Sequence, residues 1–193
     1  VERVFIFGKP YERTHANGKI QSFMGGLRHF ITQNEWDLGN TEPTERAFVE
    51  FLEYAMRYGK GGRWYGRGVK YLYCPAVLMT IIEFWAKNRL QVLPEFKEKL
   101  GLTVKEYEST QGKVRLINDP ILDPEGMAFL VDMDHVNTLQ FANRGYKIVR
   151  NREDNDMDGK ALELFADLGL KSEGVGDGEP HAVIYGESLK SAA

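Results

Sequence analysis

The apolar residues of this sequence are most concentrated in two consecutive segments near its middle. Val69–Cys74 has the length and composition of a β-strand, and Pro75 then opens the run Ala76–Ala86, in which apolar residues fall almost all round a helical wheel. A helix of this kind is in contact with protein on several sides. At about 15 residues it is shorter than the roughly 20 residues that span a bilayer. The pattern therefore predicts the core of a folded domain and not a membrane anchor.

Other apolar residues recur at helical spacing. A helix is predicted to begin near Thr41, with Thr41 as its N-cap and Pro43 in its first turn, and to end at Gly59. Its buried stripe consists of Phe48, Phe51, Leu52, Ala55 and Tyr58. Shorter helical segments are predicted at Phe23–Ile31, Pro94–Leu100 and Leu162–Leu170.

Short apolar runs bounded by turn residues predict strands. The clearest case is a hairpin in which Leu102–Tyr107 and Val114–Ile117 flank the turn Thr110-Gln111-Gly112. Asn17-Gly18 is a second hairpin-type turn, inside a polar and irregular segment, and Asn34–Asn40 is predicted to be a connector. Further strands are predicted at Val1–Phe7, Met127–Val131, Leu139–Phe141, Tyr146–Val149 and His181–Tyr185. This mixture of helices and strands predicts the α+β class.

Charge is distributed unevenly along the 193 residues, which are enough for one large domain or two small ones. The net charge is −3, but Glu153–Glu179 holds nine acidic residues against two lysines, a local net charge of −7 that leaves +4 for the rest. The overall charge gives no general affinity for nucleic acid. Cys74 is the only cysteine, so the sequence predicts neither an internal disulfide nor a cysteine-based metal site.

One acidic segment resembles half of a calcium-binding loop. Asp154, Asp156, Asp158 and Gly159 match the first half of an EF-hand loop, in which alternating carboxylates surround Ca²⁺. The twelfth position of such a loop needs a bidentate Glu, and here it is Phe165. A solvated acidic loop ahead of a helix is the favoured interpretation.

Asp132, Asp134 and His135 form a second candidate metal site, because carboxylates and imidazole suit divalent metals. If this segment is a strand, Asp132 and Asp134 lie on one face and His135 on the other. The favoured interpretation is a strand end with exposed acids.

Basic and aromatic residues alternate around the glycine-rich connector Gly59–Gly68. We call this segment the contact strip; its principal residues are Arg57, Lys60, Arg63, Trp64 and Arg67, with Lys70, Tyr58, Tyr65 and Tyr71 among them. Cations interleaved with aromatic rings can hold single-stranded nucleic acid. A surface loop pinned to the core by its aromatic residues is the favoured alternative, because the net charge does not favour nucleic acid.

No motif of a known catalytic class occurs. The sequence contains no nucleophile elbow, zinc-protease helix or dinucleotide fingerprint, and its four histidines are scattered. The sequence therefore predicts a protein that is not an enzyme and needs no cofactor.

Several short segments follow one another in an informative order. They are Glu2–Lys9, Asn17-Gly18, Gly25–Leu27, the helix ending at Tyr58-Gly59, Val69–Pro75, Tyr107–Val114, Asp119-Pro120, Leu130–Asp134 and Ile184–Leu189. Each segment is short and degenerate, but their order spans nearly the whole chain. In this order the sequence resembles the major capsid proteins of tailed bacteriophages.

The resemblance implies a Hong Kong 97-type fold, with an axial domain that packs around five- and six-fold positions and a peripheral domain that contacts neighbouring capsomers. Residues 1–38 would be a peripheral-domain segment, 39–135 the axial domain, and 136–193 returning strands and the C-terminal segment. The N-terminal arm, the extended loop and the first part of the long spine helix are expected to precede Val1 and to be missing here. No catalysis is implied beyond the self-crosslinking of some family members.

The function implied is that of a major capsid (major head) protein, which self-assembles into the icosahedral shell around a double-stranded DNA genome. Its expected partners are copies of itself in hexamers and pentamers, together with scaffolding, portal or decoration proteins, and no membrane. It is expected in the virion capsid, and in the host cytoplasm during assembly. The acidic Glu153–Glu179 segment is expected on an outer or inter-subunit surface, away from DNA.

Two alternatives from other classes stay open. The first is a single-strand nucleic-acid-binding module that uses the contact strip. The second is a metal-dependent enzyme that uses Asp132, Asp134 and His135 or the acidic loop.

Overall fold

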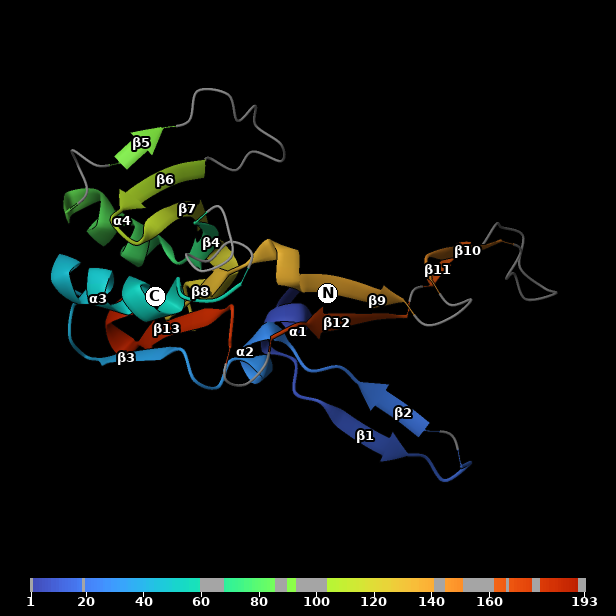
Figure 1. The fold of residues 1–193 in the computed structure, drawn as a ribbon. Coiled ribbons are helices and arrows are strands. Elements are labelled where there is room, and N and C mark those ends of the chain that lie inside the picture. The colour runs from blue at the N-terminus through green and yellow to red at the C-terminus, as the bar shows by residue number, and fades with distance from the viewer. Residues whose placement is uncertain are drawn as a thin grey trace.

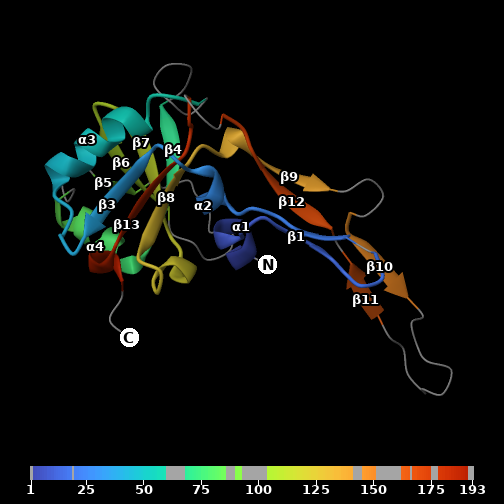
Figure 2. The ribbon, with the colours of Figure 1, turned by 90° about the horizontal axis from the view of Figure 1, so that it is seen from below.

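The computed structural model of this chain describes residues 2–18, 20–59, 68–85, 90–92, 104–140, 145–150, 162–165, 167–174 and 178–190. Helices and strands are mixed along these ranges, so the predicted α+β class is confirmed. A body built on one large sheet carries two β-ribbons that project from the same side (Figures 1 and 2).

The body is organised by a seven-stranded mixed sheet with the order β3-β13-β8-β4-β7-β6-β5. Its strands are β3 (Glu35–Gly39), β4 (Val69–Cys74), β5 (Leu90–Val92), β6 (Val104–Ser109), β7 (Gly112–Asn118), β8 (Met127–Val131) and β13 (Ala182–Gly186). β4 lies at the centre, parallel to β7 and antiparallel to β8. β13 returns from the far end of the chain and runs parallel to β3.

Successive side chains of a strand point to opposite faces, and in β8 and β13 the side chains on both faces are buried. On one face, α3 (Glu45–Ala55) and α4 (Ala76–Trp85) cover Leu72, Leu130 and Ile184. On the other face, α1 (Glu2–Phe7) and α2 (Leu27–Phe30) contribute to a smaller cluster that contains Phe129, Val131 and Val183. The two adjacent strands β8 and β13 therefore supply side chains to both cores.

The helices of the larger core largely follow their sequence patterns. Phe48, Phe51, Leu52 and Ala55 of α3 are buried as predicted, but the N-cap is Thr44, whose side chain accepts a hydrogen bond from the Ala47 amide. α4 is confirmed, with Leu78, Ile81 and Ile82 buried. The prediction that protein surrounds it on several sides is wrong at its C-terminal end, where the Phe84 side chain is 79% exposed.

Three predictions of local structure are wrong. Residues 2–7 form the helix α1, because Ile6 and Phe7 pack onto the smaller core and the Gly8 amide closes the last turn on the Val4 carbonyl. Residues 35–39 form the strand β3, paired with β13. The predicted helix Leu162–Leu170 is replaced by the strands β11 (Leu162–Phe165) and β12 (Leu168–Ser172). Short apolar runs do not distinguish helix from strand by periodicity alone.

The predicted hairpin turns are confirmed, except that the loop between β6 and β7 has two residues and not the predicted three, because Gly112 pairs with Ser109. β6 and β7 pair from Ser109 to Gly112 around a two-residue loop, and Gly112 has a φ of +147°. β1 (Tyr11–Thr14) and β2 (Ile20–Phe23) flank the Asn17-Gly18 turn, where Gly18 has a φ of +74°. The predicted helix Pro94–Leu100 lies outside the described residues.

The two ribbons are each two strands wide. The first is the hairpin β1–β2. The second is formed by β9 (Val136–Gln140) with β12, and further out by β10 (Lys147–Arg150) with β11. Three single 3₁₀ turns, η1 (Pro120–Leu122), η2 (Met133–His135) and η3 (Glu187–Leu189), complete the described elements. No helix among the described residues is long and apolar enough to cross a membrane.

Candidate functional site

The structure describes only part of the predicted contact strip. Arg57 follows α3 and is exposed, whereas Lys60, Arg63, Trp64 and Arg67 lie outside the described residues. Tyr71 lies on β4, where its hydroxyl accepts a hydrogen bond from Arg115 Nη1 at 3.1 Å. The structure therefore leaves the role of this strip as a prediction.

Lys70 does not belong to an exposed strip, which corrects one member of the predicted set. Alternation along β4 places it on the buried face together with Leu72 and Cys74. Its Nζ donates hydrogen bonds to the carbonyl oxygens of Ala55 at 2.7 Å and Pro180 at 2.6 Å. Lys70 therefore joins the end of α3 to the segment before β13. Burial lowers the pKa of Lys70 to about 8, and the negative charge of Asp132 acts in the opposite direction.

A buried polar cluster surrounds this lysine. The Asp132 amide donates to Nδ1 of His181 at 3.2 Å, which assigns the proton of the neutral imidazole to Nε2. Burial, followed by the positive charge of Lys70, lowers the pKa of His181 to about 4. His181 is therefore uncharged at neutral pH. Nε2 of His181 is buried and has no hydrogen-bond partner among the described residues.

The candidate metal site at Asp132, Asp134 and His135 is not assembled. Asp132 is buried rather than exposed, which corrects the sequence-based interpretation, and its Oδ1 accepts a hydrogen bond from the Asp134 amide as the N-cap of η2. Nδ1 of His135 lies 3.2 Å from Asp132 Oδ2, without the geometry of a hydrogen bond. Across the described part of the chain, no three His, Cys, Asp or Glu side chains are grouped to hold a metal ion. The EF-hand-like residues 154–159 lie outside that part.

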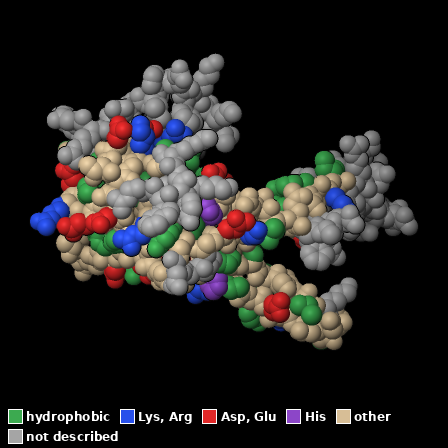
Figure 3. Space-filling view, in the orientation of Figure 1, with side chains coloured by type: hydrophobic (Ala, Val, Ile, Leu, Met, Phe, Trp, Pro, Cys, Tyr) green, Lys and Arg blue, Asp and Glu red, His purple; other side chains and the backbone are tan. Residues whose placement is uncertain are grey.

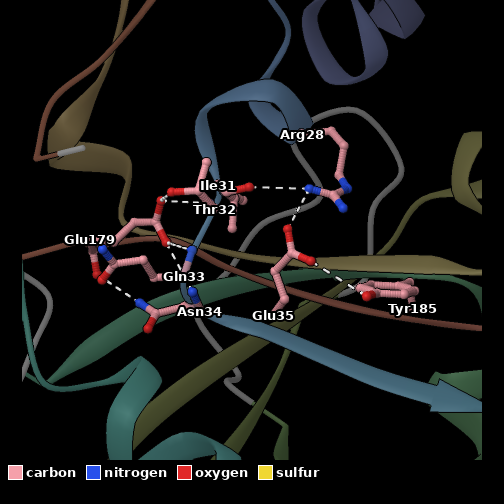
Figure 4. Close-up of polar contacts among 8 residues, drawn as sticks. All are labelled: Arg28, Ile31, Thr32, Gln33, Asn34, Glu35, Glu179 and Tyr185. Carbon is pink, nitrogen blue, oxygen red and sulfur yellow. Dashed lines mark hydrogen bonds and ion pairs between the residues drawn. The ribbon is translucent and has the colours of Figure 1, made fainter. Parts of the chain in front are cut away.

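Glu179 is a buried acid whose carboxylate is held by backbone amides (Figure 4). Its side chain is only 3% exposed. One carboxylate oxygen accepts from the Thr32 amide at 2.8 Å, and the other accepts from the Gln33 and Asn34 amides at 2.9 and 3.0 Å. Three consecutive backbone donors therefore converge on one carboxylate, and charge strengthens each of these bonds.

The side chain of Asn34 completes this junction from the other direction. Its Nδ2 donates to the carbonyl oxygens of Glu179 at 2.9 Å and His181 at 3.1 Å. The Asn34 carbonyl accepts from the Val183 amide at 2.9 Å, which starts the pairing of β3 with β13. We call these contacts between residues 32–34 and 179–183 the Glu179 junction.

A second group of polar contacts lies beside the Glu179 junction (Figure 4). Arg28 of α2 donates to Glu35 Oε1 at 2.8 Å and to the Ile31 carbonyl at 3.1 Å. The Tyr185 hydroxyl lies 3.4 Å from the other oxygen of Glu35, and the Arg28 guanidinium lies 5.6 Å from the centre of the Tyr185 ring. Together the two groups fix α2 and the base of the β1–β2 ribbon to the sheet.

The ribbons expose apolar side chains (Figure 3). Ile20 is 68% exposed on β2 and Ile148 is 60% exposed on β10, and Tyr11, Phe23 and Leu139 are also exposed. A two-stranded ribbon is marginally stable alone. Apolar residues exposed on such a projection are typical of an interaction surface.

Comparison with known proteins gives a family for this arrangement. The family model described as SU10 major capsid protein matches residues 1–172. The chain belongs to this family. The prediction of a major capsid protein of a tailed phage, which rested on the order of short segments, is therefore confirmed. No curated protein matches the chain.

A solved structure supports the fold of this capsid-family chain. A chain from Mycobacterium phage Patience superposes with a TM-score of 0.52 at 13% sequence identity. The match covers 97% of the present chain and 58% of the Patience chain. The present chain thus spans little more than half the length of that relative.

The capsid-family chain also has an apolar groove beside α1, with a cavity volume of about 610 Å³. Its wall is built from α1, α2, β4, β8, β9, β12 and the segment from Ile117 to Leu122. Glu2 and Asp119 are the charged residues among the described residues that line it, and both are acidic.

Sequence reasoning missed Lys70 and Glu179 as structural residues. Each had a local signal: Lys70 interrupts an apolar strand, and Glu179 precedes Pro180 at the start of the last apolar strand. A charged residue in such a position is buried only when it finds partners, and those partners come from distant segments.

Proposed function

We propose that this chain is part of the structural subunit that self-assembles into the icosahedral shell of a tailed bacteriophage or prophage. The shell would enclose a double-stranded DNA genome. The observation that carries the proposal is the pair of ribbons, which present apolar side chains to solvent on strands that gain little stability by themselves. A shell subunit would bury these surfaces against its neighbours. Membership in a capsid protein family supports the same conclusion.

The proposed partners are copies of the same subunit, arranged as hexamers and pentamers through head-to-tail contacts that close into rings. Scaffolding, portal or decoration proteins would act on the assembled subunits. The protein would be located in the virion capsid, and in the host cytoplasm during assembly. This role requires neither a catalytic residue nor a cofactor.

We assign the chain to the Hong Kong 97-type fold, which the similarity to the Patience chain supports. The sheet with α3 and α4 would form the axial domain. The helices α1 and α2 and both ribbons would form the peripheral domain. This assignment differs from the ranges expected from the sequence (1–38, 39–135 and 136–193), because it places β3 and β13 in the axial domain, within whose sheet both strands pair.

Two surfaces have proposed roles in the shell. The contact strip, among whose principal residues Arg57 is the described one, would touch a neighbouring subunit or nucleic acid. The acidic Glu153–Glu179 segment, apart from the buried Glu179, would face outward or toward a neighbour, because packaged DNA repels acidic residues. A map of the shell with this segment on the inner wall would contradict that orientation.

The experiment that tests the proposal is negative-stain electron microscopy of the full-length gene product, expressed with its scaffolding gene where one is present. Closed shells or capsomer rings are expected. Monomers alone, from protein with its N-terminal region intact, would contradict the proposal.

The strip provides a second comparison. Arg63→Glu with Arg67→Glu would abolish binding of a single-stranded oligonucleotide if the protein were a nucleic-acid-binding module. The shell proposal expects these changes to alter assembly only.

A further inference from the structure

The apolar groove beside α1 has a chemistry that selects its occupant. Phe5 and Ile6 of α1 form one side, and Phe129 and Val131 of β8 form part of the other. Its charged lining residues in the described ranges are the acids Glu2 and Asp119. An occupant should therefore have apolar side chains for the wall and a positive charge for the rim.

The β1–β2 ribbon has these two properties on one face. Tyr11 pairs with Phe23 and Arg13 pairs with Gln21 across the hairpin, so these four side chains share a face. The Tyr11 and Phe23 rings lie 6.3 Å apart and form a continuous exposed apolar surface. Residues 8–24, which contain the hairpin, hold three basic residues and one acidic residue.

We propose that the Tyr11–Phe23 face of the β1–β2 ribbon docks in the α1 groove of a second copy of this chain. The aromatic pair would fill the apolar part of the groove, and Arg13 would lie near Glu2 of the neighbour. The inference deepens the proposed shell function and rests on it.

Paired aromatic side chains distinguish this ribbon from the other one. The strands of the other ribbon, β9, β10, β11 and β12, carry Lys147, Arg150 and Lys171 against Glu163, so their charge does not exclude them from the acidic rim. Their exposed apolar residues Leu139 and Ile148 lie on different strand pairs, β9–β12 and β10–β11, and form no aromatic pair like Tyr11 and Phe23. An aromatic pair covers more of an apolar groove than a single aliphatic side chain does.

The test is disulfide trapping between two variants of the full-length protein that each carry one added cysteine, Phe23→Cys and Ile121→Cys, co-assembled into shells and then oxidised. Ile121 lines the groove, and the two cysteines lie on different polypeptides, so any cross-link joins two copies. The native thiol does not compete, because Cys74 is fully buried and burial raises its pKa to about 12. A dimer is expected from the mixture and not from either variant alone. As the matched control, Ile148→Cys on the outer ribbon should give no dimer with Ile121→Cys.

A charge exchange provides the second readout. Arg13→Glu should lower the yield of shells several-fold, and adding Glu2→Arg in the same chain should restore it. Shells that form without the expected cross-link, or with another segment or a small apolar molecule filling the groove in a cryo-EM map, would overturn the docking. Wild-type protein that forms neither shells nor capsomers would instead contradict the proposed function, and the docking would fall with it.

Discussion

The carboxylate of Glu179 accepts a hydrogen bond from the backbone amide of Asn34, which lies 145 residues earlier in the chain (Figure 4). The same carboxylate holds the two preceding amides, and the Asn34 side chain donates back to the Glu179 carbonyl. The Glu179 junction therefore fixes the start of β3 against the start of β13. Both strands lie at one edge of the sheet, and α2 with the β1–β2 ribbon precedes β3 in the chain.

Glu179→Gln should destabilise the protein strongly although it preserves the shape of the side chain. Glutamine has an NH₂ group in place of one carboxylate oxygen of glutamate. This NH₂ group would face backbone N–H groups, which need a hydrogen-bond acceptor. Hydrogen bonds to a buried charged group contribute about 1.5–3 kcal/mol each, so we expect a loss of roughly 3 kcal/mol. For a chain of this size each kcal/mol lowers Tm by roughly 2–4 °C, which circular dichroism measures.

Glu187→Gln is the matched control for this change. Glu187 is exposed and pairs with Lys190 in the last described turn, so its replacement should change stability by less than about 1 kcal/mol. Equal effects of the two substitutions would show that the Glu179 junction does not stabilise the fold.

Lys70→Met should change how stability depends on pH at the alkaline side. The pKa of Lys70 is lowered from 10.5 to about 8, mainly by burial. Between pH 8 and 10.5 the unfolded chain holds a proton that the folded chain has released, so the free energy of unfolding rises with pH across this window. The rise amounts to about 3 kcal/mol. Urea unfolding at several pH values should show it in the wild type and not in Lys70→Met.

Lys113, whose side chain is partly exposed, serves as the comparison for this experiment. It pairs with Glu106 and Glu108, and these partners raise its pKa rather than lower it. Lys113→Met should therefore keep the alkaline rise. If the free energy of unfolding of both the wild type and Lys113→Met stays constant from pH 8 to 10.5, burial does not lower the pKa of Lys70.

The central part of the fold could be predicted from sequence because its pattern is local. Val69–Cys74 alternates as a strand, and Pro75 ends it and starts α4. The segment at Glu2–Phe7 could not be assigned this way, because its four consecutive apolar residues fit a buried strand as well as a helix. Its helical form depends on the contact of Phe7 with Phe129, a residue more than a hundred positions away.

The buried polar cluster around Lys70 was harder to predict, because its contacts also join segments that are distant in the sequence. Lys70 looked like a member of a basic strip because its neighbours in sequence are basic and aromatic, but strand alternation turns it inward. The partners that permit its burial are the carbonyls of Ala55 and Pro180, and no sequence motif connects these residues. Backbone partners carry no residue signature, so only the folded chain reveals them.

His181→Asn should make the protein less sensitive to acid. The pKa of His181 is lowered from 6.5 to about 4, mainly by burial. As the pH falls from 6.5 to 4, the unfolded chain gains a proton that the folded chain does not bind, so the wild type loses stability by about 3 kcal/mol. Asn removes this titration, and its Oδ1 can still accept the hydrogen bond from the Asp132 amide. Chemical unfolding at pH 7 and at pH 4.5 measures the difference.

His29→Asn is the control for acid sensitivity, because His29 is exposed on α2. This variant should lose as much stability on acidification as the wild type. If His181→Asn also loses as much, the acid response comes from other groups of the protein and His181 is not protonated on unfolding in this range.

Two glycines with positive φ allow the packing of the buried cluster to be tested separately from backbone strain. Gly39 has a φ of +55° and open space around the position of a β-carbon, so Gly39→Ala should cost only about 1 kcal/mol of backbone strain. Gly59 has a φ of +93°, and a β-carbon there would overlap Asp132 Oδ2 and lie 2.9 Å from Pro180 Cβ. Gly59→Ala should therefore cost at least about 2 kcal/mol more than Gly39→Ala, because Asp132 is held by its own hydrogen bonds and cannot move away freely. Urea midpoints of the two variants, compared with the wild type, measure this difference. Equal midpoints would show that Asp132 does not pack closely against Gly59 in the segment that follows α3.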